Sequence, residues 1–189
     1  MSFNTTTPTT PATPAAEKQT PERIATAIAW LRQGWTAQAF SLLSEPPTPT
    51  NTTTPTPTPA PVDKPPAARF ALGLCHLRAG DLPSAITCME QSHRQLAAIS
   101  APSREPTETN ETHHRLSAAQ IAEKIYLTPM DTDFCARFPK TAAQMVMLAL
   151  IHTYQKNNMP DQARRLAAAL TGPIFEEYKK KLTENMPIS

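Results

Sequence analysis

The sequence predicts an all-α protein assembled from helical hairpins that are interrupted by Thr/Pro-rich stretches. A helix-turn-helix pattern occurs three times, at 30–43, 76–89 and 154–167, and no segment alternates apolar and polar residues over the length of a strand. Two further stretches, 5–14 and 46–66, alternate Thr with Pro, which removes backbone donors and leaves little to bury. We therefore expect a stack of hairpins joined by disordered segments.

The three copies place the same kinds of residue at the same distances from a turn. The turn residues are Gly34, Gly80 and Asn158, and the left-handed conformation that ends many helices favours Gly and Asn. A ring lies four residues before each turn and an alanine five residues after it. These positions hold Trp30, His76 and Tyr154, and then Ala39, Ala85 and Ala163. Because a large residue on one helix and a small one on the next let helices pack closely, each copy predicts a helical hairpin.

The second copy resembles a known family. In residues 69–92, its apolar, small and turn residues follow the order of a tetratricopeptide repeat: Leu72-Gly73, His76, Gly80-Asp81-Leu82, Ala85-Ile86 and Met89. The segment 68–86 is also similar to the central repeat of the small tetratricopeptide chaperones of bacterial type III secretion, which hold an apolar segment of a translocator or needle subunit before export. The resemblance implies a stack of hairpins and a non-catalytic, protein-binding scaffold or chaperone-like adaptor, with bacterial secretion as the narrower expectation.

The other two copies depart from the family pattern. Ala27 and Ile151 replace the glycine of the first helix, and Asn157-Asn158-Met159 stands where Gly-Asp is usual. The turns at 34 and 80 are 46 residues apart and those at 80 and 158 are 78 apart, whereas tandem repeats recur about every 34 residues. The predicted array is therefore interrupted.

Start and stop signals set the expected limits of the helices. Thr20-Pro21-Glu22 supplies a cap and a first turn, and capping boxes occur at Ser117-Ala-Ala-Gln120 and Thr141-Ala-Ala-Gln144. One helix is expected over 117–127, where Thr128-Pro129 stops it, and the next is expected to start at Thr141. Between these two helices the sequence predicts no other clear helix.

These limits divide the chain into six parts. They are a disordered tail over 1–19, a first hairpin over 20–45, a disordered loop over 46–66, the tetratricopeptide-like hairpin over 67–99, a polar connector over 100–116 and a helical region over 117–185. The last part is expected to hold the third hairpin and a C-terminal capping helix, in which Ile174, Phe175, Tyr178 and Leu182 share one face. Such a helix would cover the apolar end of the stack.

Composition argues against several classes of partner. The 18 basic residues are balanced by 16 acidic ones, for a net charge of +2, so we expect no binding of nucleic acid. The apolar run 145–151 is far shorter than the roughly 20 residues of a membrane-spanning helix, so no membrane insertion is expected. The first residues carry no secretory signal, and three cysteines, an odd number, fit a reducing compartment. The expected location is the cytoplasm.

No motif in the sequence predicts catalysis. The four glycines form no phosphate-binding loop, and neither a metalloprotease nor a nucleophile-elbow motif is present. Cys75, His76, Cys88 and His93 lack the spacing of a zinc site, so buried structural cysteines are the preferred interpretation. Asp131-Thr132-Asp133 lacks the rest of a calcium loop and is interpreted as a turn or helix cap. We expect no enzymatic activity, no metal and no cofactor.

The functional prediction depends on the first helix of each hairpin, which lines a concave surface in tetratricopeptide arrays. The side chains expected there are Ile24, Ile28, Leu31, Phe70, Leu74, Leu77 and Leu148, with His152 and Gln155. A cation lies two residues before each turn, as Arg32, Arg78 and Lys156. The Lys and Asn clamp with which some family members hold a carboxylate terminus is missing from the matching positions. The predicted ligand is therefore an apolar or amphipathic segment of a partner protein, flanked by acids.

Other interpretations stay open at this stage. The apolar residues of the first helices fit the core of a closed bundle as well as they fit an open groove. A nucleic-acid adaptor would need its cations on one face, and a helical-repeat enzyme would need titratable residues in a pocket, such as a His beside Cys135. A homo-oligomer is also compatible with the sequence.

Overall fold

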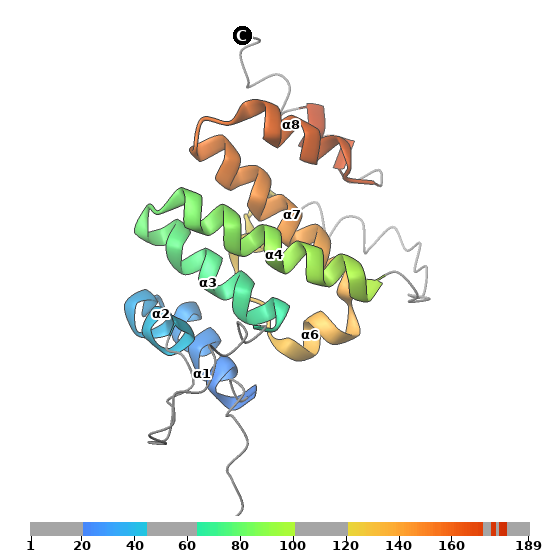
Figure 1. Ribbon diagram of the computed structural model, residues 1–189. Helices are drawn as coiled ribbons and strands as arrows, with labels where there is room; N and C mark the ends of the chain where they lie inside the picture. Colours follow the sequence, from blue (N-terminus) through green and yellow to red (C-terminus); the bar gives the residue numbers. More distant parts are fainter. Residues whose placement is uncertain (1–20, 45–63, 101–120, 172–174, 177, 181–189) are drawn as a thin grey trace, which may run out of the picture.

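The computed structural model describes residues 21–44, 64–100, 121–171, 175–176 and 178–180. Within these ranges the secondary structure is helical and contains no β-strand (Figure 1), which confirms the all-α prediction. The predicted tail over 1–19, the loop up to residue 63, the connector from residue 101 and the capping box at Ser117 lie outside the described residues.

Three helical hairpins form the stack. They are α1 (Pro21–Arg32) with α2 (Thr36–Ser44), α3 (Pro66–Ala79) with α4 (Leu82–Ser100), and α7 (Pro139–Lys156) with α8 (Pro160–Ala168). The first hairpin packs on α3, and α4 packs on α7, so the hairpins stack in chain order (Figure 1). All three predicted turns are left-handed, with φ of 87° at Gly34, 82° at Gly80 and 55° at Asn158.

Small residues bring the helices of each hairpin together. Ala39, Ala85 and Ala163 are all fully buried, as the repeated pattern predicts. In the middle hairpin the approach is closest at Gly73, where an added Cβ would lie 2.8 Å from Cγ of Met89 and 3.3 Å from the carbonyl oxygen of Ala85. A side chain at position 73 would therefore displace Met89 or push the two helices apart, which favours glycine here.

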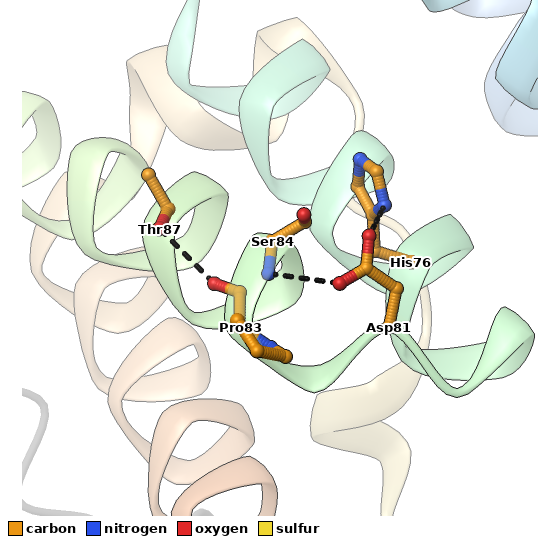
Figure 2. A network of polar contacts seen from close by, with 5 residues as sticks. All are labelled: His76, Asp81, Pro83, Ser84 and Thr87. Carbon is orange, nitrogen blue, oxygen red and sulfur yellow. Dashed lines mark hydrogen bonds and ion pairs between the residues drawn. The ribbon is translucent and has the colours of Figure 1, made fainter.

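Hydrogen bonds cap both helices at the turn of the middle hairpin. The backbone N–H of Asp81 donates to the carbonyl of His76 at 3.0 Å and so ends α3, whereas the Asp81 carboxylate accepts from the backbone N–H of Ser84 at 3.2 Å and so begins α4. Figure 2 shows the two contacts of this carboxylate, one with the backbone N–H of Ser84 and one with Nδ1 of His76, which lies 3.0 Å away. The hydrogen bonds from Ser84, followed by the nearby His76, lower the pKa of Asp81.

The region before α7 differs from the prediction of a single helix. Residues 121 and 122 are helical, Lys124 then adopts a left-handed φ of 57°, and a 3-10 turn, η1 (Ile125–Leu127), follows. A second short helix, α6 (Thr132–Arg137), was not predicted. Asp131 is its cap, as interpreted from the sequence, because its carboxylate accepts from the backbone N–H of Phe134 at 2.7 Å.

Helix α7 begins at Pro139, two residues before the expected start at Thr141. Proline suits the first turn of a helix because its fixed φ is helical and its missing N–H has no partner there. It also disfavours helical geometry in the preceding residue, and Phe138 has φ −129° and ψ 58°. The proline, not the capping box, therefore sets the boundary between α6 and α7.

One hydrophobic core runs through the three hairpins and reaches the C-terminal residues. Its largest fully buried side chains include Phe70, Met89 and Ile151. Phe175 is also buried, and residues 175–176 and 178–180 are helical, at the place of the predicted capping helix. Among the described residues, no helix has the length and apolar character needed to span a membrane.

Candidate protein-interaction face

The predicted groove residues lie on α1, α3 and α7, and we call the surface of these helices that carries them the first-helix face. Its seven apolar members, each with at most 9% of its surface exposed, are Ile24, Ile28, Leu31, Phe70, Leu74, Leu77 and Leu148. In this structure these seven side chains are buried, as the closed-core alternative expects.

A piece of the chain itself lies against the helices of the first-helix face. We call residues 121–138 the covering segment. Its η1 packs on α7, and its α6 packs on α1, α3 and α7 (Figure 1). Tyr126, Pro129, Met130 and Cys135 are its buried residues. The covering segment therefore joins the partner helices of the hairpins among the elements that pack on α1, α3 and α7.

Arg32 holds the covering segment through two polar contacts. Its Nη2 donates to the carbonyl oxygen of Pro129 at 3.2 Å and lies 3.8 Å from Oδ2 of Asp131. Both charged side chains are 49% exposed, so solvent screens the ion pair and its contribution is small. Arg32 therefore fixes the position of the segment more than it stabilises the fold.

His152 is the second predicted residue that contacts the covering segment. Its ring centroid lies 6.2 Å from that of Tyr126 in an edge-to-face arrangement. Burial lowers the pKa of His152, and the nearby Lys156 and Lys124 lower it further. Protonation of His152 is therefore disfavoured at its place beside Tyr126.

The structure does not keep the three predicted cations together. Nη1 of Arg78 donates to the carbonyl oxygen of Leu31 at 2.7 Å, so this side chain joins α3 to the end of α1. Arg32 contacts the covering segment, whereas Lys156 and Gln155 are exposed at the end of α7. All three cations of the predicted row are exposed, but Arg32 and Arg78 each donate to a backbone carbonyl of another part of the chain, whereas Lys156 lies at the end of α7.

The sequence reasoning missed the covering residues. Tyr126 and Met130 follow no helical period, and their burial depends on helices distant in the sequence. The available signal was Asp131, whose role as a cap was predicted but whose position beside Arg32 was not.

The cysteine and histidine side chains that the sequence offered as candidates for chemistry lie in packed surroundings. Burial raises the pKa of Cys75 to about 11 and that of Cys135 to about 12, so both thiols stay protonated at neutral pH. His76 packs edge-to-face on Phe40 at 5.2 Å, beside Asp81. Within the described ranges, no three His, Cys, Asp or Glu side chains are grouped as metal ligands would be.

Comparison of the chain with protein-family models, with curated proteins and with solved structures gave no match. A functional assignment must therefore be argued from the geometry of the first-helix face and its covering segment.

Proposed function

We propose that the protein is a non-catalytic interaction scaffold whose first-helix face binds an apolar or amphipathic segment of a partner protein. The observation that carries this proposal is the covering segment. An irregular stretch of chain, with short 3-10 and α-helical pieces, already lies against α1, α3 and α7. This packing supports a face that can take a chain segment, and here the segment comes from the same molecule.

The contacts of the covering segment indicate the chemistry of a partner. Tyr126 and Met130 bury apolar side chains, while a backbone carbonyl at Pro129 and a carboxylate at Asp131 meet one arginine. Apolar anchors combined with a few oriented polar contacts are typical of peptide recognition. The ligand that the sequence predicts, an apolar segment flanked by acids, has the same combination of features.

Two further features support a scaffold. The middle hairpin resembles a tetratricopeptide repeat, and its Gly73, Gly80 and Ala85 serve the packing and turn roles that the resemblance implies. The buried thiols of Cys75 and Cys135 are poor nucleophiles because their raised pKa values keep them protonated.

The proposal can be tested by mapping the complex with a partner isolated under reducing conditions from the native source. Hydrogen exchange of the free protein and of the complex should differ in α1, α3, α7 and the covering segment. A complex that changes exchange at the outer faces of α2, α4 and α8 alone would contradict the proposal.

Two sets of variants separate the first-helix face from other binding surfaces. Lys156→Glu should slow association with an acid-flanked partner, whereas Arg94→Glu, the same charge change at an exposed position of α4, should not. Deletion of residues 1–19 or shortening of 46–63 should leave the affinity unchanged in calorimetric titration. Loss of binding in these deletions would place recognition in the Thr/Pro-rich stretches instead.

A further inference from the structure

We propose that the covering segment is a displaceable internal ligand, which must leave the first-helix face before a partner segment can bind there. This inference rests on the proposed function and adds its regulation. The protein in the closed form described above would then be the inhibited state of the scaffold.

The covering segment is held by far fewer buried residues than the helices beneath it. The 18 residues 121–138 bury four side chains, those of Tyr126, Pro129, Met130 and Cys135, whereas α3 buries eight of its 14 residues and α7 nine of its 18. Regions with few buried apolar contacts open locally at a lower free energy than the global unfolding of the protein. The segment is therefore expected to open while the hairpins stay folded.

Two local features weaken the hold on the segment. Lys124 occupies the left-handed region, which glycine adopts freely but in which the Cβ of a lysine crowds the backbone. The ion pair of Arg32 with Asp131 is 3.8 Å long and half exposed, so it gives position but little stability.

The joint at Phe138 allows the segment to move without disturbing α7. Phe138 is non-helical and 47% exposed, and the following Pro139 donates no backbone hydrogen bond. The carbonyl of Phe138 accepts from Ala142 within α7, whereas its N–H donates to Phe134 in α6. Opening of the segment breaks the second bond and keeps the first.

An internal ligand lowers the apparent affinity for an external one. When only a fraction of molecules has the face open, the apparent dissociation constant is the intrinsic one divided by that fraction. A variant that loosens the segment but leaves the face intact should therefore bind an external segment more tightly than the parent does.

Asp131→Arg is such a variant. It removes the cap of α6 and places a second cation beside Arg32, and it changes no residue of α1, α3 or α7. Asp133→Arg is the matched control, because it makes the same charge change on the exposed side of the same helix. Hydrogen exchange should show faster exchange at the backbone amides of Phe134 and Phe138 in Asp131→Arg alone, with α3 and α7 unchanged.

The probe is a fluorescein-labelled synthetic peptide with the sequence of residues 121–138, measured by anisotropy against the full chain in reducing buffer. We expect it to bind Asp131→Arg at least about tenfold more tightly than it binds the parent or Asp133→Arg. A second peptide carrying Asp131→Arg should bind the loosened variant less tightly than the native peptide does, because it repels Arg32.

Two results would overturn the inference. In the first, the hydrogen-exchange rates of α6 are the same in Asp131→Arg as in the parent. In the second, these rates rise but the peptide binds Asp131→Arg no more tightly than it binds the parent. Each outcome can be separated from failure of the proposed function. If the isolated partner binds on the first-helix face with equal affinity in parent and Asp131→Arg, the scaffold function stands and the internal ligand does not. If the partner binds elsewhere, the proposed function itself fails.

Discussion

The middle hairpin of α3 and α4 is held together by its backbone geometry, whereas the covering segment is held by a few side chains and a half-exposed ion pair. In the hairpin, Gly73 lies directly against Met89 and Ala85, and both helices are capped at Gly80 and Asp81. The covering segment has one side-chain cap, at Asp131, and its regular pieces are three and six residues long.

Because of this difference, the core is expected to have two stabilities, one for global unfolding of the stack and one for local opening of the covering segment. We expect the hairpin to unfold only together with the whole stack, so a substitution in it should lower the free energy of global unfolding. Residues of the covering segment stabilise only its closed position. A substitution there can therefore lower the free energy of unfolding by no more than the free energy that opens the segment. The two regions should therefore respond differently to the same substitution.

The largest expected difference is between Met89→Ala and Met130→Ala. Both side chains are buried, but Met89 lies on α4 and Met130 in the covering segment. Met89→Ala should lower the free energy of unfolding by about 2–5 kcal/mol in a urea titration, whereas Met130→Ala should lower it by less than about 2 kcal/mol. Equal losses would mean that the segment unfolds with the stack.

Ala85→Leu tests the close packing of the middle hairpin. A larger side chain at this fully buried position should force α3 and α4 apart and cost about 1–3 kcal/mol in chemical denaturation. The same change at Ala97, an exposed position of α4, should leave stability within about 0.5 kcal/mol of the parent. Similar costs at both positions would show that the helices are not in close contact at Ala85.

Substitutions at the left-handed residues of the two regions should change stability in opposite directions. At Gly80 an added Cβ would meet no atom within 4 Å, so the expected loss of about 1–2 kcal/mol in Gly80→Ala is conformational. Lys124→Gly should instead slow hydrogen exchange in the covering segment, by a stabilisation of less than about 1 kcal/mol, since it relieves the same conformation. Faster exchange in Lys124→Gly would contradict this account.

The smallest expected effect is a dependence on pH that is confined to the covering segment. The pKa of His152 is lowered by burial and by Lys156 and Lys124, so the closed form binds a proton less readily than the open form. Stability of closure should be complete above the ordinary histidine pKa of about 6.5 and should fall as the pH drops below it.

Hydrogen exchange of η1 and α6, corrected for intrinsic rates at pH 7.5 and pH 5.5 (on the order of one unit either side of the histidine pKa), checks this dependence. His152→Gln should remove it. His93→Gln is the control: the pKa of His93 is also lowered by burial, but His93 lies on α4, so the acid response of the covering segment should persist. An unchanged response in His152→Gln would assign it to another group.

The elements that the sequence predicted are those with a local cause. Gly34, Gly80 and Asn158 lie at turns because the left-handed conformation favours their residue types, and Ala85 is buried because the opposing helix leaves no room. These relations act over a few residues and are visible as a repeated pattern.

The covering segment has no such local cause. Its place depends on the contact of Asp131 with Arg32 and on that of Tyr126 with His152, and both contacts join distant parts of the chain. For the same reason the sequence left open whether Phe70 and Leu74 line a groove or a core, because the period of a helix identifies its apolar face and not what covers that face. The expected start of α7 at Thr141 failed because two local signals competed, and Pro139 prevailed.

The hydrogen bond from Arg78 to the carbonyl of Leu31 joins residues that are 47 positions apart. The carbonyl of Leu31 also accepts from the nearby backbone N–H of Gly34, but during synthesis α1 leaves the ribosome before its second donor, the guanidinium of Arg78, has been made. At typical elongation rates the delay is on the order of a few seconds, far longer than a helix needs to form. Lys64, which donates to the carbonyl of Leu43, reaches the end of α2 in the same way. The first hairpin therefore gains these two contacts only after the start and the end of α3 have been synthesised.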